Sequence, residues 1–190
     1  MHSEESIQQI FDQFEISGSF RTASPYGSGH INDTYLVQTL PPTNPDYILR
    51  KINKYVFKNP PALLKNIAMV TDHLRQRKEQ YHLNEAGLDY ILKLIPSVSG
   101  EYYVTDQHQD YWSLLYFIPE SKTLDVVENT EQALEGGKAF GNFIRNLTNF
   151  PVNELHISIP HFHDVEKRLE WFRESVNRAP KNKLTEVKEL

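Results

Sequence analysis

The sequence predicts an α+β fold, in which an antiparallel sheet packs with one major helix and a purely helical region follows. Segments rich in β-branched and aromatic residues recur between residues 19 and 117 and surround one long helical pattern. The strand pattern stops after Pro119, and only helical patterns follow it. The composition changes over residues 118–124, so we expect two parts, residues 1–120 and residues 121–190.

The first part alternates between helix and strand signals. Residues 3–14 carry Ile and Phe at helical spacing, with Ser3 as the candidate N-cap and Gly18 as the residue that ends the helix. A longer helix is expected to start at Asn59, because the two prolines that follow are tolerated in a first turn. The strands are expected at about residues 19–25, 33–40, 46–52, 90–95, 101–106 and 111–117, with DQHQD as the turn before the last.

The second part carries two amphipathic helix patterns. Asn129 or Thr130 is expected to cap the first pattern, and Asp164 the second. Three glycines lie within the first pattern, where each costs roughly 1 kcal/mol relative to alanine. We interpret them as points where another element approaches the helix closely. They are Gly136, Gly137 and Gly141.

The composition excludes several classes of protein. A net charge of −5 without a long basic run argues against sequence-independent binding of nucleic acid. The chain has no cysteine, so it forms neither a disulfide nor a thiolate metal site. No apolar run approaches the roughly 18 residues of a membrane span, and the N-terminus is unlike a targeting peptide. We therefore expect a cytoplasmic protein that binds neither nucleic acid nor a membrane.

The turn between the first two strands, residues 26–35, carries the strongest chemical signal. Glycine lets the backbone approach an anion, and successive N–H groups in such a turn form a concave anion site. Ser28, Asn32 and Thr34 add neutral donors. The spacing alone equally fits an ordinary hairpin loop, because Asn32 stands where a kinase-type loop has its third glycine. The turn is neither a Rossmann fingerprint nor a P-loop, since a strand follows and no G-K-[ST] is present.

Two cations, Arg50 and Lys51, interrupt the apolar third strand. A cation within a buried strand needs an anionic partner, and the α- and β-phosphates of a nucleotide would provide one. The period of two points the two side chains to opposite faces, so one can face a nucleotide and the other solvent. The sequence does not say which, and a fraying strand end is the alternative interpretation.

Six segments in order resemble one protein family: GSGHINDTYLV, YILRKIN, VFKNPPALLKNI, DYWSLLYFI, AFGNFIRNLTNFP and IPHFHD. The chain resembles the aminoglycoside-phosphotransferase (choline-kinase-like) branch of the protein-kinase-like fold. Within that branch it is most similar to N-acetylhexosamine 1-kinases. The resemblance spans nearly all 190 residues, and its motifs are specific as a set rather than one by one.

The resemblance implies a kinase-like N-lobe that binds ATP with Mg²⁺, followed by the first helices of a C-lobe. Residues 26–34 would cover the phosphates, Arg50 or Lys51 would hold the α- and β-phosphates, and the hinge at 116–120 would contact adenine. The acceptor would be a sugar hydroxyl, the anomeric one of an N-acetylhexosamine. His30 and Asp33 would lie near that acceptor. The implied ATP-binding residues are Gly27, Ser28, Gly29, Asn32, Thr34, Arg50, Lys51, Tyr116, Phe117 and Ile118.

The catalytic loop of this family is absent from the sequence. Phosphoryl transfer in this fold uses an Asp and an Asn in an H-x-D-x-x-x-x-N loop. The only H-x-D lies at residues 108–110, at the predicted hairpin tip, and Leu115 stands in place of the Asn. Residues 184–190 have the pattern of a helix cut short. We therefore expect the base, the metal ligands and the rest of the C-lobe beyond Leu190, and an inactive isolated chain.

Two alternative functions and one structural question remain open at this point. A catalytically silent module that binds a nucleotide or a partner is one, and a choline or aminoglycoside kinase is another. The restraint on the strand cation is also open, because the long helix offers only Asp72 in its interior and Glu79 near its end. Asp72 can pair with the cation or face solvent.

A histidine-rich segment near the C-terminus is a weak candidate for a metal site. Imidazole and carboxylate groups suit zinc, and the segment contains His156, His161, His163 and Asp164. The H-x-H lies in a loop before a helix, and N-capping accounts for Asp164. We therefore expect no metal site in this chain.

Overall fold

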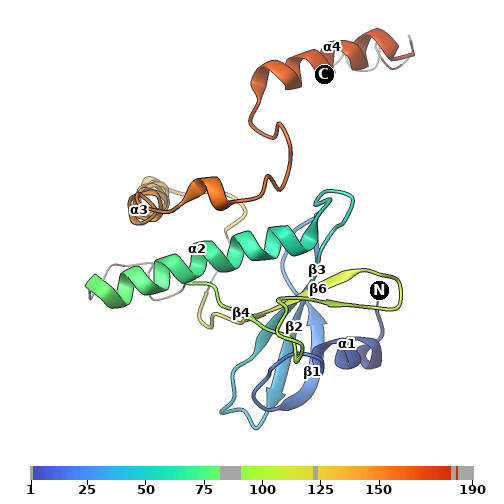
Figure 1. Cartoon of the computed structure of the whole chain (residues 1–190), viewed down its shortest axis with the longest axis vertical. Coiled ribbons are helices and arrows are strands. Elements are labelled where there is room, and N and C mark those ends of the chain that lie inside the picture. Colours follow the sequence, from blue (N-terminus) through green and yellow to red (C-terminus); the bar gives the residue numbers. More distant parts are fainter. Residues whose placement is uncertain (1, 82–90, 122–123, 181–182, 184–190) are drawn as a thin grey trace. The chain divides into compact units, whose positions relative to one another are not determined.

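A computed structural model describes the chain except for residues 1, 82–90, 122–123, 181–182 and 184–190. The chain forms two compact units, Met1–Ser158 and Ile159–Leu190. The first holds a sheet and the helices α1, α2 and α3, and the second holds α4 (Figure 1). None of the helices in the described ranges has the length and apolar character that crossing a bilayer requires.

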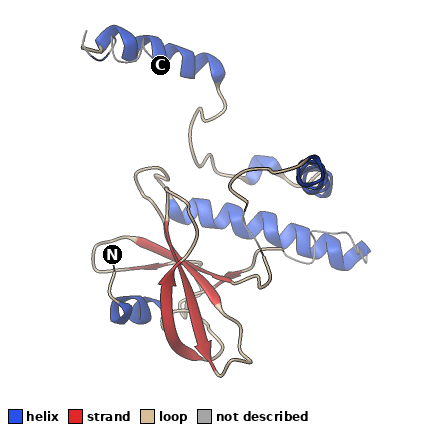
Figure 2. Cartoon of the chain, turned by 180° about the vertical axis from the view of Figure 1, so that it is seen from behind, coloured by secondary structure: helices blue, strands red, loops and turns tan. Residues whose placement is uncertain are grey.

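The sheet has six antiparallel strands in the described part of the chain (Figure 2). Its order is β1-β2-β3-β6-β4, and β5 also pairs with β6. The α+β class with an antiparallel sheet is therefore confirmed, whereas its assignment to a kinase-like N-lobe stays a prediction. The strands are β1 (Ser19–Pro25), β2 (Asp33–Leu40), β3 (Tyr47–Lys51), β4 (Leu94–Ile95), β5 (Val104–Thr105) and β6 (Tyr111–Tyr116).

Helix α1 (Glu4–Phe11) covers one face of the sheet. Ser3 caps it as predicted, because its Oγ accepts a hydrogen bond from the Ser6 amide at 3.2 Å. The prediction that this helix reaches residue 14 and is ended by Gly18 is wrong. The helix stops at Phe11 because the chain turns to bury Phe14 in the same core, where it forms an isolated bridge with Ser97. The core on this face also contains Tyr47, Leu49, Trp112 and Leu114.

Helix α2 (Pro60–Tyr81) covers the other face. Its start is as predicted, since the Asn59 side chain accepts from the Ala62 amide at 3.2 Å. Leu64 and Ala68 of the helix pack against Leu94 and Leu115 of the sheet. The two faces of β3 therefore meet two different helices, and this arrangement decides where each of its side chains points.

The strands around the DQHQD turn are shorter than predicted. The hairpin itself is confirmed, because the Asp106 amide donates to the Asp110 carbonyl at 3.1 Å. The strand expected over 90–95 is reduced to Leu94–Ile95 among the described residues, with Pro96 directly after it. The strand expected over 101–106 is reduced to Val104–Thr105, because Tyr102 and Tyr103 pack beside α2 instead.

Helices α3 (Thr130–Asn146) and α4 (Val165–Arg178) follow the sheet. Asn129 rather than Thr130 caps α3, since its Oδ1 accepts from the Gln132 amide at 2.9 Å. Asp164 caps α4 as predicted, accepting from the Lys167 amide at 2.9 Å. A short 3₁₀ helix, Val152–Glu154, lies between them in sequence. The helix pattern at 184–190 lies outside the described residues.

The interpretation of the α3 glycines as close contacts is wrong within the described part of the chain. No heavy atom lies within 4 Å of a Cβ built at Gly136, Gly137 or Gly141. The apolar face beside them is open as well, with Phe140 66% exposed and Ile144 56% exposed. The structure gives no packing reason for these glycines.

Candidate functional site

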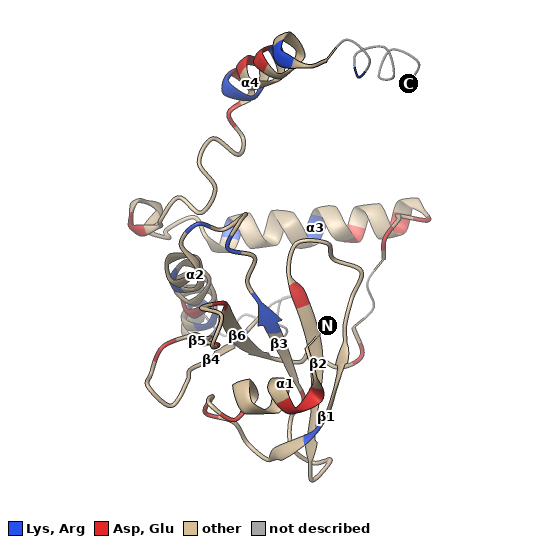
Figure 3. Cartoon of the chain, turned by 90° about the vertical axis from the view of Figure 1, so that its right-hand side faces the viewer, with Lys and Arg blue, Asp and Glu red and all other residues tan. Residues whose placement is uncertain are grey.

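The two cations of β3 lie on opposite faces of the sheet, as the period of two predicts. The strand register pairs Arg50 with Thr34 of β2 and Ser113 of β6, whereas it pairs Lys51 with Trp112. Trp112 belongs to the core beneath α1, so Lys51 points to the α1 face and Arg50 to the α2 face. The basic end of β3 that carries both residues is visible in Figure 3.

Arg50 lines a cavity of about 210 Å³ on its face of the sheet. The side chain is half-buried, and loss of solvation lowers the pKa of its guanidinium. No carboxylate of the described residues pairs with it. A half-buried guanidinium without an anionic partner favours the binding of an anion. The other lining residues are Tyr26, Ile48, Leu92, Leu115, Tyr116, Phe117, Ile118 and Ser121.

Lys51 is already paired within the protein. Its Nζ lies 2.7 Å from Oδ2 of Asp110, and Nζ of Lys54 lies 2.7 Å from the other oxygen of the same carboxylate. Hydrogen bonds from the two lysines lower the pKa of Asp110. Nζ of Lys51 also lies 6.0 Å from the centre of the Trp112 ring. Of the two candidate cations, Arg50 is therefore the one that faces the cavity.

The predicted hinge residues form one wall of this cavity. The Tyr116 amide donates to the Lys93 carbonyl at 3.2 Å, and the Phe117 amide donates to the Asp46 carbonyl at 2.9 Å. The Ile118 amide and the Phe117 carbonyl make no hydrogen bond with the described residues. The two groups belong to one trans peptide bond and point in opposite directions, so at most one of them can face the cavity.

The glycine-containing turn joins β1 to β2 at the edge of this site. The Tyr26 amide donates to the Thr34 carbonyl at 2.9 Å and closes the turn, and the Tyr26 ring meets Phe117 edge-on at 5.7 Å. Gly27 has a φ of +82°, which favours glycine. A Cβ at Gly27 or Gly29 would meet nothing within 4 Å, so this part of the turn lies open. The Ser28 hydroxyl donates to Asp125 at 3.0 Å.

The remaining predicted residues divide between the two faces. Thr34 lies opposite Arg50 in the strand register and shares its face of the sheet. Asp33 lies opposite Lys51 in the register, so it belongs to the other face, and it is exposed. His30 is exposed in the turn. The side-chain oxygen of Asn32 is directed to the protein rather than to a ligand, because Oδ1 accepts a hydrogen bond from the Asn53 amide at 2.9 Å. The structure therefore gathers the hinge, Arg50 and the turn, and it leaves Asp33 apart from them.

The long helix provides no ion pair for Arg50 in the described structure. Asp72 pairs with Arg75, one turn along α2. Arg75 also donates to the Leu92 carbonyl at 2.7 Å. Of the two uses left open for Asp72, the structure shows a local pair on the helix rather than a pair with the strand cation.

The described residues contain no group of three His, Cys, Asp or Glu side chains arranged to hold a metal ion. In the histidine-rich segment, Nδ1 of His161 lies 2.9 Å from Asp164, which is the capping residue of α4. This pair is a local contact at a helix start.

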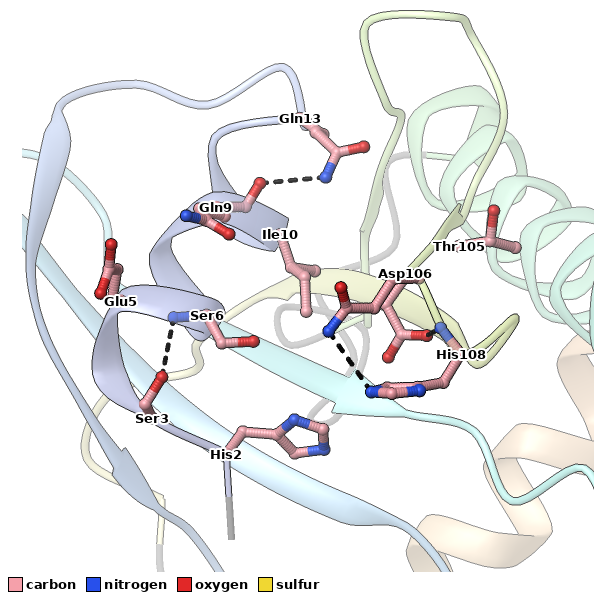
Figure 4. Close-up of a pocket in the computed structure, with 11 residues that line it drawn as sticks. His2, Ser3, Glu5, Ser6, Gln9, Ile10, Gln13, Thr105, Asp106 and His108 are labelled. Atoms are coloured by element: carbon pink, nitrogen blue, oxygen red, sulfur yellow. Dashed lines mark hydrogen bonds between the residues drawn. The ribbon is translucent and has the colours of Figure 1, made fainter.

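A second hollow, of about 610 Å³, lies on the α1 face between that helix and the turn after β5 (Figure 4). Its lining mixes amides, hydroxyls and imidazoles with the carboxylates of Glu5 and Asp106. Two carboxylates make this hollow unsuited to a phosphate group. Sequence reasoning missed this hollow, because its walls come from segments about 100 residues apart.

Sequence reasoning also missed two residues that organise the site, Asp110 and Asn53. The sequence places Asp110 only at a hairpin tip, whereas its carboxylate pairs with two lysines and is 14% exposed. Asn53 contacts the glycine-containing turn from the segment after β3. The run of Arg50, Lys51 and Lys54 was the available signal for a nearby carboxylate.

No protein-family model matches the chain.

Proposed function

We propose that this chain is the ATP-binding portion of a small-molecule kinase, closest to the N-acetylhexosamine 1-kinases. The observation that carries the proposal is the half-buried Arg50, which has no carboxylate partner among the described residues and lines a cavity with the hinge residues. The ordered motifs of the sequence support the same assignment. The position of the cation, in one cavity wall beside residues 116–118, suits a nucleotide.

The cavity suits the base of the nucleotide better than the whole molecule. Its volume of about 210 Å³ lies below the roughly 300–1,000 Å³ of pockets that enclose a complete small ligand. Either the Ile118 amide or the Phe117 carbonyl can form one hydrogen bond with the edge of adenine, since the two point in opposite directions. In this arrangement the phosphates lie outside the cavity, where the Arg50 guanidinium neutralises them and the Gly27–Gly29 amides cover them.

The proposed reaction moves the γ-phosphoryl group of ATP to the anomeric hydroxyl of an N-acetylhexosamine. The products are ADP, the sugar 1-phosphate and a proton. Mg²⁺ accompanies ATP in such reactions and neutralises charge on the phosphates. The described residues contribute nucleotide positioning, and no H-x-D-x-x-x-x-N sequence occurs in the 190 residues to supply the base.

Calorimetric titration of the purified chain with MgATP and with adenosine tests the nucleotide site. Arg50→Gln should weaken MgATP binding about 10- to 100-fold, the range for losing charge-assisted hydrogen bonds. It should leave adenosine binding within about twofold, because adenosine has no phosphate. Lys51→Gln is the matched control, since it removes the same charge from the adjacent residue on the opposite face. Absence of MgATP binding, or a larger effect of Lys51→Gln, would contradict the proposal.

The missing motif favours a second candidate, a module that binds nucleotide without transferring phosphate. Both candidates share the Arg50 site and predict no phosphotransfer by the purified chain. The assay offers MgATP with an N-acetylhexosamine, choline or an aminoglycoside and measures the phosphorylated acceptor. Transfer to the sugar would show that the base lies within these 190 residues, and transfer to choline or an aminoglycoside would replace the acceptor class.

A further inference from the structure

Asn53 joins the glycine-containing turn to the segment that follows β3. Its backbone amide donates to Oδ1 of Asn32 at 2.9 Å, and its side-chain Nδ2 donates to the Ile31 carbonyl at 3.0 Å. Its side-chain Oδ1 accepts from the amides of Tyr55 and Val56 at 2.9 and 3.3 Å. One amide side chain therefore donates to the turn and accepts from its own segment.

The base of this connection is fixed to the sheet. The Ile52 amide donates to the Tyr111 carbonyl at 2.8 Å, and Ile52 is only 2% exposed. The Phe57 amide donates to the Asn53 carbonyl at 2.9 Å and closes a turn there. Asn53 thus lies three residues after Arg50 on backbone that both the sheet and this turn hold in place.

The two halves of the glycine-containing turn are held differently. The downstream half, residues 31–32, makes two hydrogen bonds with Asn53. In the upstream half, Gly27 and Gly29 have open space around them, and the side-chain contacts that the described structure shows are the exposed Ser28–Asp125 hydrogen bond and the edge-on contact of Tyr26 with Phe117. The turn is therefore held at Tyr26 and at residues 31–32, with its glycines open between these points.

We propose that Asn53 is a positioning residue that fixes the downstream end of the turn in register with Arg50. The glycine half then closes over a ligand about a fixed point at residues 31–32. The consequence for phosphate binding rests on the nucleotide site proposed above, whereas the anchoring itself does not. Asparagine suits this position because the contacts require a donor and an acceptor in one short side chain.

Substitutions at Asn53 separate its two kinds of contact. Asn53→Asp keeps an oxygen for the amides of residues 55 and 56 and loses the donor to the Ile31 carbonyl. Asn53→Ala loses both. Asn32→Ala removes the acceptor on the turn side. The matched control is Asn44→Asp, because Nδ2 of Asn44 donates to the Leu40 carbonyl at 3.2 Å in the β2–β3 turn, away from this site.

Hydrogen exchange of the purified chain without nucleotide tests the anchor. Exchange of the Tyr26 amide, which closes the turn through the Thr34 carbonyl, should accelerate about fivefold in Asn53→Asp and in Asn32→Ala, the effect of losing one hydrogen bond. Asn53→Ala should in addition accelerate the hydrogen exchange of residues 55–57, which the other variants should not. Asn44→Asp should leave hydrogen exchange in the glycine-containing turn unchanged. Unchanged exchange in both Asn53→Asp and Asn32→Ala would overturn the proposal.

MgATP titration tests whether the anchor positions the turn for phosphate. Asn53→Ala and Asn53→Asp should both weaken MgATP binding about fivefold and leave adenosine binding unchanged. Agreement between the neutral and the charged variant separates anchoring from the added negative charge. Faster exchange with unchanged MgATP affinity would overturn the positioning role. If the wild-type chain binds no MgATP, the proposed function fails, and the exchange result still decides the anchor.

Discussion

Arg50 and Lys51 are adjacent in sequence and point to opposite faces of the sheet, Arg50 toward the cavity lined by residues 116–118 and Lys51 onto Asp110 at 2.7 Å. The difference follows from the alternation of side chains along a strand whose two faces pack against different helices. The ammonium of Lys51 forms an ion pair with Asp110 that connects β3 to the β5–β6 hairpin. Of the two cations, Arg50 is therefore the one that can bind an external anion.

The Lys51–Asp110–Lys54 cluster should stabilise the fold modestly. We expect Asp110→Asn to lower the free energy of unfolding by about 1 kcal/mol. The cost stays near the value for surface pairs because the side chains of Lys51 and Lys54 are 23% and 40% exposed and solvent screens them. Urea unfolding at neutral pH measures this. Glu101→Gln is the control, since it removes the same charge from an exposed side chain without an ion pair among the described residues.

The same cluster predicts a pH dependence. The lysines lower the pKa of Asp110 below its ordinary value of 3.8 in the folded chain. Its stabilising contribution is therefore complete above pH 3.8 and is lost as the pH falls through the lowered value. The acid side of the stability curve should be shallower below about pH 4 in Asp110→Asn than in Glu101→Gln. Equal slopes in the two variants would show that the lysine contacts do not persist in solution.

Much of the sheet could be predicted from local pattern. Alternating apolar residues and turn residues located β1, β2 and β3 to within a residue or two, because the packed faces of these strands impose a period of two. The choice between Arg50 and Lys51 could not be predicted, because it depends on which helix covers which face. That information lies in contacts such as Leu64 with Leu115, which are far apart in sequence.

In the candidate site too, local sequence predicts some features, whereas others depend on contacts between residues far apart in sequence. Local sequence located the glycine-containing turn, since turn residues leave local signals, whereas the hinge assignment of residues 116–120 came from the family resemblance alone. It did not locate Asn53 or Asp110, whose roles arise from hydrogen bonds across strands. It also placed Asp33 with the turn, whereas the strand register turns that side chain toward the face of Lys51.

Truncating a core aromatic residue and truncating a surface one should change the free energy of unfolding by very different amounts. Phe11 is fully buried and contacts the rings of Phe20 and Tyr47, so Phe11→Ala should cost about 3–5 kcal/mol. Phe140 on α3 is 66% exposed, so Phe140→Ala should change stability by no more than about 0.5 kcal/mol. Urea unfolding of both variants measures the difference. A large loss in Phe140→Ala would mean that another surface covers this face of α3 in solution.

The half-buried imidazole of His73 gives the last prediction. Its Nε2 atom is buried without a hydrogen-bond partner in the described structure, and its ring meets Phe150 edge-on at 5.3 Å. An unpaired buried polar atom costs about 1–3 kcal/mol, so His73→Phe should raise the free energy of unfolding by about 1 kcal/mol while keeping the aromatic contact.

His73→Leu is the comparison variant, because it removes the polar atom and the aromatic contact together. Its free energy of unfolding should rise less than that of His73→Phe, since edge-to-face aromatic pairs contribute about 0.5–1.5 kcal/mol. Urea unfolding of the three proteins ranks them. A loss of stability in both variants would show that Nε2 of His73 has a hydrogen-bond partner in solution, and the order of the two variants then measures the aromatic contact alone.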